Sequence, residues 1–442
     1  MMSEKGVLQP GDIDILDGIE FCGIERSGRV LSVKGSLVRT SLPDVRVGEL
    51  VRIRRDAGDL EGEVIGFDTG GAIVMPYGRM GAVAADAEVV PAESRPTVPC
   101  GDAVRGRVLD ALGRDYRTRE PIEDADQTPL FAEPPSALDR RPIEEAVSTG
   151  VRALDAFLTI GRGQRVAIAA AAGVGKSTLL GALVKNIRAD RIVIALVGER
   201  GNEPRDFLDK HLDADARGRT TVVVSTSDQS PLMRLRAAYV ATAIAEAARA
   251  RGEDVVLLMD SVTRFARALR DVGQALGEPL GPGGIPASTA QVLAQLVERA
   301  GNDAYGSITA FYTLLAESDD LDDPIVQETV SLLDGHIVLS QEIQKRKRFP
   351  AIDVLMSVSR RMGDVVDGAH RDLVARVAEI ESEYWKNYWP IKMGEYDAER
   401  SASEMEACHR QLEEFLRQKF TDADAPTLTE TLTAFEEQFG EW

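Results

Sequence analysis

RVAIAAAAGVGKSTLLGALVKNIRA, residues 165–189, predicts an apolar strand over 165–170, a turn of small residues and a helix over 176–189. Small residues let the backbone N–H groups of such a turn surround a phosphate, and the helix N-terminus adds the positive end of its dipole. Lys176 would reach the terminal phosphates, and the Ser177 hydroxyl would bind Mg²⁺. We therefore predict a nucleotide-binding turn made of Ala172, Gly173, Val174, Gly175, Lys176, Ser177 and Thr178.

One position departs from the usual pattern GxxxxGK[ST], because Ala170 stands where the first glycine is expected. Taken alone, this imperfect match also fits an ordinary glycine-rich turn between a strand and a helix. The apolar run before the turn and the helical stretch after it are the context that a phosphate loop requires, and they favour the functional interpretation.

Outward from this turn, apolar and β-branched runs alternate with helix-like stretches such as 233–250. Strands that alternate with helices predict an α/β fold with a parallel sheet covered on both faces. The predicted strands, besides 165–170, are 191–197, 220–226, 255–260, 307–315 and 336–340.

Two of these runs end in a carboxylate. Asp260 closes VVLLMD (255–260), where it would hold Mg²⁺ or its water beside the phosphate loop. Glu199 lies in VGERG (197–201), where it would orient and polarise an attacking water. Taken alone, Asp260 is a weak signal, and Glu199 is equally compatible with a surface turn.

The flanking segments differ from this α/β part. Residues 1–95 contain short alternating runs punctuated by glycine, over 28–33, 35–40, 48–53, 62–67 and 72–78, which predict a small β-barrel. Residues 361–442 lack strand signals and predict helices over 371–384 and 405–420. The apolar stripes of these helices are Leu373, Val377, Ile380 and Tyr384 in the first, and Met405, Cys408, Leu412 and Phe415 in the second.

Composition excludes several classes of protein. The net charge of −20 argues against a general nucleic-acid coat, and the apolar runs are far shorter than the ~18 residues of a membrane span. The N-terminus shows no signal-peptide pattern. Three well-separated cysteines, Cys22, Cys100 and Cys408, predict free structural thiols in a reducing cytoplasm.

The chain resembles the ATPases of type III secretion systems and of flagellar export, which are relatives of the catalytic subunits of rotary ATP synthases. The resemblance rests on ten ordered stretches: GRVLDALGR (106–114), GVRALDAFLTIGRGQRVAI (150–168), AGVGKSTLLG (172–181), VGERG (197–201), LLMDSVTRFARA (257–268), LVERAGN (296–302), GSITAFYTLLAESDD (306–320), LDGHIVLS (333–340), FPAIDVL (349–355) and SVSR (357–360). The tail adds only MGEY (393–396).

The resemblance implies a RecA-like P-loop core over 96–360, an N-terminal β-barrel over 1–95 for oligomerisation, and a C-terminal helical domain over 361–442 for docking of cargo and chaperones. It also implies Mg-ATP hydrolysis by a homohexamer whose sites are shared between neighbours. The roles carried over by position are catalysis for Lys176, Glu199, Arg200 and Arg264, a metal role for Ser177 and Asp260, adenine packing for Phe349, and an arginine finger in the adjacent subunit's site for Arg360.

The partners implied are a stator or regulator protein, a central stalk protein, the export gate and chaperone–effector complexes, with no nucleic acid. The implied location is the cytoplasm, with peripheral association at the inner-membrane export apparatus. Ala170 favours the injectisome branch over the flagellar branch. The segment 277–301, whose part 277–288 diverges most, lacks the Arg, Tyr and Phe of the family's channel loop. The resemblance therefore does not predict whether this segment contacts the stalk protein or the substrate.

Four alternatives remain at this stage: a flagellar export ATPase, a rotary catalytic subunit, a hexameric RNA translocase and a nucleotide-binding scaffold without hydrolysis. Residues 1–95 hold 11 basic and 16 acidic side chains, which disfavours the RNA translocase. Lys176, Glu199 and Arg360 occur together in one chain, which disfavours the scaffold and fits a ring of identical subunits.

Overall fold

The computed structural model describes residues 26–93, 96–316, 322–396, 402–419 and 425–442. The chain divides into two compact units, Met1–Arg95 and Pro96–Trp442, and each is described by itself. The first unit ends where the predicted barrel ends.

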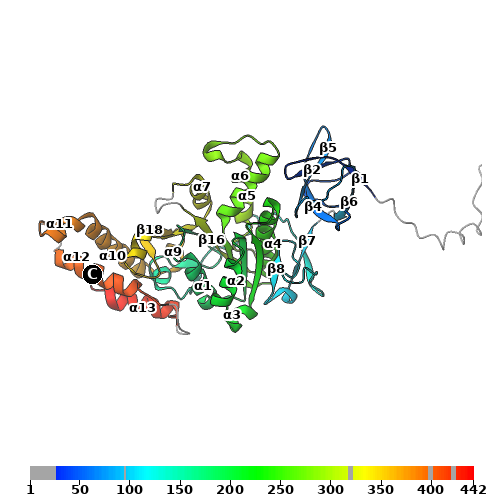
Figure 1. The fold of residues 1–442 in the computed structure, drawn as a ribbon. Coiled ribbons are helices and arrows are strands. Elements are labelled where there is room, and N and C mark those ends of the chain that lie inside the picture. Colours follow the sequence, from blue (N-terminus) through cyan, green and yellow to red (C-terminus); the bar gives the residue numbers. More distant parts are fainter. Residues whose placement is uncertain (1–25, 94–95, 317–321, 397–401, 420–424) are drawn as a thin grey trace, which may run out of the picture. The chain divides into compact units, whose positions relative to one another are not determined.

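Within residues 26–93, six strands close into an antiparallel barrel in the order β1-β2-β5-β4-β3-β6 (Figure 1). Val30, Val38, Val51, Val64 and Val74 are among the buried residues that fill it. The predicted barrel is confirmed, and its sixth strand lies beyond the last predicted run, which ends at 78. The strands are β1 (Gly28–Lys34), β2 (Leu37–Thr40), β3 (Leu50–Ile53), β4 (Leu60–Asp68), β5 (Gly71–Pro76) and β6 (Glu88–Glu93).

In the described part of the second unit, eight strands form one sheet in the order β18-β17-β12-β16-β15-β13-β14-β8. Neighbouring strands are parallel throughout, except that β18 runs antiparallel to β17. The predicted α/β class is confirmed. The strands are β8 (Val108–Asp110), β12 (Arg165–Ala170), β13 (Arg191–Glu199), β14 (Thr220–Thr226), β15 (Asp254–Asp260), β16 (Ser307–Leu315), β17 (Gly335–Leu339) and β18 (Ile352–Ser359).

The two edge strands were absent from the sequence-based prediction. β8 has three residues, too few for a periodic signal. β18 is only partly buried and is interrupted by Asp353 and Ser357, so it lacks the continuous apolar run of the inner strands. Two smaller pairs, β7 (Thr97–Cys100) with β9 (Asp126–Pro129) and β10 (Ala146–Val147) with β11 (Ile160–Gly161), lie outside this sheet.

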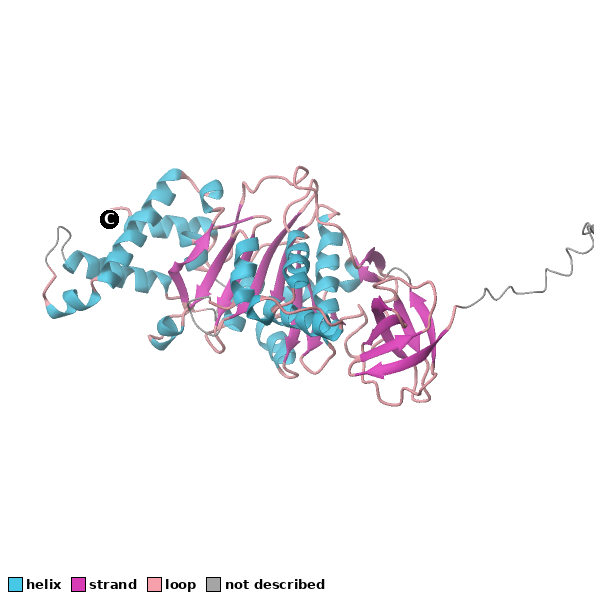
Figure 2. Ribbon diagram, turned by 90° about the horizontal axis from the view of Figure 1, so that it is seen from above, coloured by secondary structure: helices cyan, strands magenta, loops and turns pink. Residues whose placement is uncertain are grey.

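Helices cover both faces of the sheet (Figure 2). Because crossovers between parallel strands are right-handed, α1 to α3 pack on one face and α4 to α7 on the other. Ser230, Ser261 and Asp323 accept backbone N–H groups at the starts of α4, α5 and α7 and so define where these helices begin. The bounds are α1 (Lys176–Asn186), α2 (Glu203–His211), α3 (Ala214–Gly218), α4 (Pro231–Arg249), α5 (Val262–Ala275), α6 (Ala287–Glu298), α7 (Pro324–Leu332) and α8 (Gln341–Lys345), with short 3₁₀ turns η2 (Asp102–Val104) and η4 (Pro282–Gly284).

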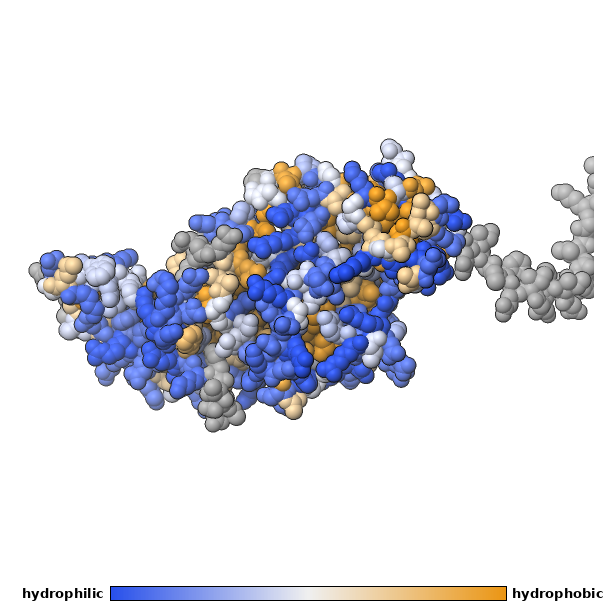
Figure 3. Space-filling model, viewed as in Figure 1, coloured by the Kyte–Doolittle hydropathy of each residue, from blue (hydrophilic) through white to orange (hydrophobic). Residues whose placement is uncertain are grey.

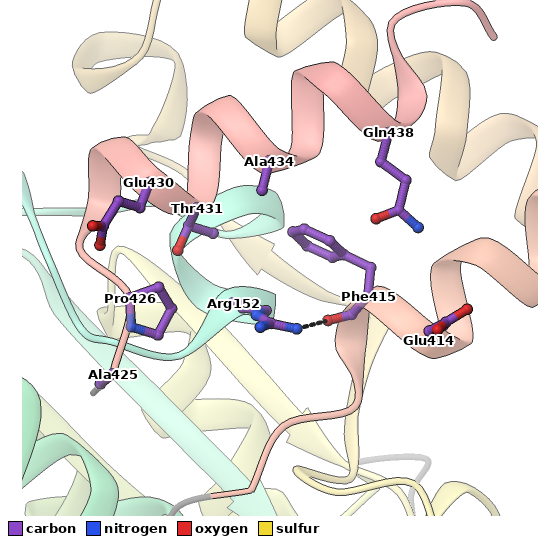
Figure 4. Close-up of a pocket in the computed structure, with 9 residues that line it drawn as sticks. All are labelled: Arg152, Glu414, Phe415, Ala425, Pro426, Glu430, Thr431, Ala434 and Gln438. Atoms are coloured by element: carbon purple, nitrogen blue, oxygen red, sulfur yellow. Dashed lines mark hydrogen bonds between the residues drawn. The ribbon is translucent and has the colours of Figure 1, made fainter. Parts of the chain in front are cut away.

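The C-terminal helices share one hydrophobic core with the α/β part. Both predicted apolar stripes are buried, and Phe435 of α13 packs edge-on against Phe157, with ring centroids 5.1 Å apart. Phe157 ends the π-helix η3 (Ala153–Phe157). Arg152, at its start, donates to the carbonyl oxygen of Phe415 (Figure 4). The helices are α9 (Met362–Val365), α10 (Gly368–Lys386), α11 (Tyr388–Met393), α12 (Ala402–Leu416) and α13 (Leu428–Phe439).

Helix α12 ends at Leu416, earlier than the predicted 420, and Phe420 lies outside the described residues. Cys100 and Cys408 are buried and form no disulfide bond within the described part of the chain, whereas Cys22 lies outside the described residues. The outward face of the helical region is largely hydrophilic (Figure 3), as its amphipathic pattern predicts. Among the described residues, every helix is too short or too polar to cross a membrane.

Candidate active site

The phosphate turn has the backbone geometry that its glycines permit. Gly173 and Gly175 adopt φ angles of +82° and +107°, and a Cβ on either would meet no atom within 4 Å, so conformation and not space requires glycine there. Gly175 precedes α1 and offers no side-chain cap, which leaves the first N–H groups of the helix facing the turn. Ala170 is buried at the end of β12 and has an ordinary backbone conformation, so this departure leaves the turn intact.

The predicted residues of the turn meet the predicted acids and bases around one cavity of about 640 Å³. They meet because β12, β13 and β15 are parallel and therefore end at the same edge of the sheet. Val174 is the exception in the turn, since its side chain is buried in the core. The predicted residues that line the cavity are Ala172, Gly173, Gly175, Lys176, Ser177, Thr178, Glu199, Arg200, Asp260 and Arg264.

Opposite charges in this cavity are paired. Lys176 Nζ lies 2.5 Å from Asp260 Oδ1, which also accepts a hydrogen bond of 2.7 Å from the Thr313 hydroxyl. The Arg264 guanidinium lies 3.2 Å from Glu199 Oε1 and donates to Glu199 Oε2 at 3.3 Å. These contacts hold both carboxylates where the strands end, next to the phosphate turn.

Glu199 is the carboxyl group whose acidity is most altered here. Its burial raises its pKa to about 8, helped by a hydrogen bond with the Glu203 carboxyl and by the nearby charge of Asp260. Lys176 and Arg264 act in the opposite direction. The same hydrogen bond lowers the pKa of Glu203, so the two carboxyls share one proton that lies on Glu199 at neutral pH.

Arg200 lines the cavity but extends into solvent, with its side chain 82% exposed and its Nε 3.9 Å from Glu203 Oε1. Phe349 is 43% exposed and is not among the residues that line this cavity. Its carbonyl oxygen accepts a hydrogen bond of 2.8 Å from Gln418 N–H. The adenine-packing role of Phe349 stays a prediction.

Arg360 lies near the ends of the sheet's parallel strands at which they begin, whereas the phosphate turn lies at the ends at which they finish. It follows β18, whose end pairs with the start of β17, and its N–H donates to the carbonyl oxygen of Asp334. The start of β17 lies beside Arg165, at the beginning of β12, whereas the phosphate turn follows the end of β12. Its side chain is exposed, and within the described residues no ion pair of its guanidinium is found.

Four further residues with charged, amide or aromatic side chains lie at the site and were not predicted from the sequence. Glu203, Phe207 and Arg267 line the cavity, and Gln344 Nε2 donates to the carbonyl oxygen of Gly173 at 2.6 Å. Helical spacing offered a signal for Arg267, three residues after Arg264 on the same face of α5. No local pattern marks Gln344, because only the pairing of β17 with β12 brings α8 beside the turn.

The oxygen donors present suit Mg²⁺. Ser177 is exposed in the cavity, and Asp260 ends β15 beside the turn. Within the described ranges, no group of three or more His, Cys, Asp or Glu side chains forms a metal cage. A single hydroxyl and a single carboxylate are the sparse protein ligand set with which Mg²⁺ binds together with phosphates and water.

Comparisons with known proteins show which family the chain belongs to. Residues 150–359 match the ATP synthase alpha/beta family, nucleotide-binding domain. The type 3 secretion system ATPase of Xanthomonas euvesicatoria is 43% identical over 387 residues, which are 87% of this chain and 88% of that protein. The flagellum-specific ATP synthase of Bacillus subtilis is 39% identical over 422 residues, covering 94% of this chain and 96% of the relative.

Solved structures extend the comparison to the whole fold. The assembled ATPase EscN of the enteropathogenic E. coli type III secretion system aligns with a TM-score of 0.87 at 38% identity, over 93% of this chain and all of EscN. EscN in complex with its central stalk EscO aligns with a TM-score of 0.85 at 37% identity, with the same coverage. The chain therefore belongs to the family of type 3 secretion system ATPases.

Proposed function

We propose that this chain forms a homohexamer that hydrolyses Mg-ATP and uses the energy to release chaperones from proteins and to unfold those proteins for export through a type III secretion apparatus. Family membership supports the ATPase activity and the secretion system. The observation that carries the chemistry is the meeting of Lys176, Glu199, Asp260 and Arg264 around one cavity beside the phosphate turn.

The turn binds the phosphates through its backbone N–H groups. Lys176 gives up its ion pair with Asp260 and binds the terminal phosphate instead. Ser177 and Asp260 are the residues that would hold Mg²⁺, which neutralises charge on the phosphate oxygens when it is bound. Arg264 and Arg200 supply cations for the charge that spreads over the terminal oxygens.

Glu199 accepts a proton from the attacking water. For this step it must first lose the proton that it shares with Glu203, and the Arg264 guanidinium stabilises the resulting carboxylate. The phosphorus–oxygen bond to the leaving diphosphate breaks as the bond from the water oxygen forms, which releases ADP and inorganic phosphate.

Arg360 acts in the site of an adjacent subunit. Its place at the edge opposite its own phosphate turn, with an exposed guanidinium, supports this role. In a closed ring of identical chains each chain offers one phosphate turn and one Arg360, so every boundary is completed in the same way.

The remaining roles follow the same proposal. The barrel of residues 1–95 joins subunits and meets a regulator, supported by the exposed apolar side chains of Leu31, Val33 and Phe67 and by the apolar surface on the barrel in Figure 3. Residues 361–442 bind chaperone–effector complexes. The ring binds a central stalk, as EscN does with EscO, and meets the export gate in the cytoplasm at the inner membrane.

Phosphate release from the purified chain tests the proposal. We expect hydrolysis that requires Mg²⁺, and a specific activity that rises with protein concentration, because half of each site comes from a neighbour. A specific activity that stays constant on dilution would contradict the shared site.

A flagellar export ATPase is the second candidate, since a flagellar relative covers the chain as fully as the secretion relatives do. Both candidates share the chemistry above. Neighbouring genes for needle components support the injectisome, whereas genes for hook components support the flagellum.

A further inference from the structure

Among the described residues, four cationic side chains line the phosphate cavity, and three of them are paired with acids. Lys176 pairs with Asp260, Arg264 with Glu199, and Arg200 with Glu203. The fourth is Arg267, whose exposed guanidinium makes no hydrogen bond or ion pair within the described part of the chain. Arg267 is therefore, as far as the described residues show, the cavity's positive charge without an acidic partner.

Its place on α5 indicates which part of a nucleotide it meets. Arg267 follows Arg264 by three residues, so the two side chains leave the same face of the helix, with a rise of about 4.5 Å between them. Arg264 pairs with Glu199, the residue proposed to act on the attacking water. The backbone of the turn, which binds the inner phosphates, lies at the start of α1. Arg267 thus lines the cavity one turn of α5 from the residue that contacts Glu199, which favours a contact with the terminal phosphate over one with the inner phosphates.

We propose that Arg267 binds the terminal phosphate of ATP and so makes the site prefer a triphosphate over a diphosphate. This rests on the proposed ATPase function. Lys176 must exchange the Asp260 carboxylate for the nucleotide, which offsets part of its gain, and Arg264 is already in contact with Glu199, whereas Arg267 has no partner to give up among the described residues. Its planar fork of N–H donors matches two phosphate oxygens at once.

The same contact predicts binding of inorganic phosphate. After hydrolysis the terminal phosphate is a free anion beside Arg267, and before nucleotide binds the cavity offers that guanidinium unpaired. We therefore expect inorganic phosphate to compete with ATP, and the competition to depend on Arg267.

Calorimetric titration of the full chain tests this proposal. In the presence of Mg²⁺, the chain is titrated with ADP and, separately, with the non-hydrolysable ATP analogue that has a nitrogen between the two outer phosphates. For Arg267→Gln we expect affinity for the analogue to fall about 10- to 100-fold, the range for one charge-assisted contact, and affinity for ADP to change by less than about 2-fold. Arg267→Lys keeps the charge without the fork, so its loss should be intermediate.

Arg205→Gln is the matched control, because Arg205 is an arginine 87% exposed on α2, outside the cavity, and the substitution removes the same charge. We expect it to bind both nucleotides like the unchanged chain. The inhibition constant for inorganic phosphate should rise about 10-fold in Arg267→Gln and stay unchanged in the control.

Equal losses for the analogue and ADP, no loss for either, or the same loss in Arg205→Gln would each overturn the assignment of Arg267. If the unchanged chain bound neither nucleotide, the proposed function itself would be wrong. If it bound both and hydrolysed ATP while Arg267→Gln behaved identically, only this inference would fail.

Discussion

At the scale of single residues, the phosphate cavity is governed by pairs of charges that must exchange partners. Before nucleotide arrives, Lys176 neutralises Asp260, and Glu199 is held between the Arg264 guanidinium and the Glu203 carboxyl with which it shares a proton. A buried charge without a partner costs free energy of folding, so these contacts stabilise the cavity in the absence of substrate. In the proposed mechanism, the nucleotide then replaces Asp260 as the partner of Lys176, and Arg264 stays in contact with Glu199.

Replacing Glu199 by Gln tests its role as proton acceptor. The amide keeps the size of the side chain and removes the base, so turnover should fall about 10²- to 10⁴-fold, whereas affinity for ATP should change little. Phosphate release and calorimetric titration measure the two effects. Equal turnover in both proteins would rule out this mechanism.

The pH dependence of kcat/KM should show the raised pKa of Glu199. Below about pH 8 Glu199 carries a proton and cannot take another from water, so kcat/KM should rise with pH and level off above that value. Glu203→Ala removes a hydrogen bond that raises this pKa, so the rise of kcat/KM should then occur at lower pH.

Asp206→Ala is the control for that shift, since Asp206 lies on the same helix, pairs with Lys210 and stands outside the cavity. Its profile should match that of the unchanged chain. If kcat/KM rises at the same pH in Glu203→Ala as in the unchanged chain, Glu203 does not affect the proton on Glu199.

At the scale of elements, α8 links the phosphate turn to the C-terminal helices. Gln344 donates to Gly173, and beyond α8 the Arg346 guanidinium lies over the Trp385 ring, 4.2 Å from its centroid. Arg348 pairs with Glu413 of α12 at 3.2 Å. One short segment, α8 and the residues just after it, therefore connects the turn to α10 and α12.

Gln344→Ala should leave the turn less well positioned. Loss of one neutral hydrogen bond is worth about 0.5–1.5 kcal/mol, so KM for ATP should rise about 2- to 10-fold with kcat within about 2-fold. Steady-state kinetics measure both constants. Lys345→Ala, on the same helix and 65% exposed, should leave KM unchanged, and an equal rise in that variant would refute the role of Gln344.

The α10–α13 helices should unfold together with the α/β part. Phe435 packs against Phe157, His370, Phe415 and Phe439, so Phe435→Ala should lower the free energy of unfolding by about 3–5 kcal/mol. Denaturant titration followed by circular dichroism measures this loss. Trp389→Ala, 69% exposed, should have little effect; a separate early transition of the helices in Phe435→Ala would show that the core is not shared.

At the scale of the whole molecule, the sheet of the second unit bears proposed functional residues at both ends of its parallel strands. The carboxyl ends of β12, β13 and β15 bear the phosphate cavity, and the opposite edge bears Arg360. One chain alone cannot bring these edges together, because the sheet separates them. If Arg360 completes a neighbour's site, as we propose, activity requires an assembly such as the proposed hexamer.

Arg360→Ala should bind nucleotide normally as an isolated chain and lose about 10³- to 10⁵-fold in turnover of the ring, the range for arginine fingers. Mixing it with Glu199→Gln restores boundaries where Glu199 from one chain faces Arg360 from the other. Random mixing at equal amounts should recover about a quarter of the unchanged activity, since one boundary in four combines both intact residues. No recovery on mixing would contradict a site shared between subunits.

Much of this architecture follows from local sequence. Phosphate turns, buried strands and amphipathic helices have short-range signatures, so the turn at 172–178, the inner strands and both C-terminal stripes are predictable from periodicity and residue size. The weakly periodic edge strands β8 and β18 are not. Asp260 and Glu199 were predictable as strand-end acids, because parallel strands bring such ends together.

Other features depend on tertiary structure alone. Strand order places Gln344 beside Gly173 and puts Arg360 at the edge away from its own phosphate turn. The shared proton of Glu199 and Glu203 and the unpaired state of Arg267 are decided by which side chains meet in the folded cavity. Local periodicity records which face of an element is buried, whereas partners and charges in a site are set by contacts between residues far apart in the chain.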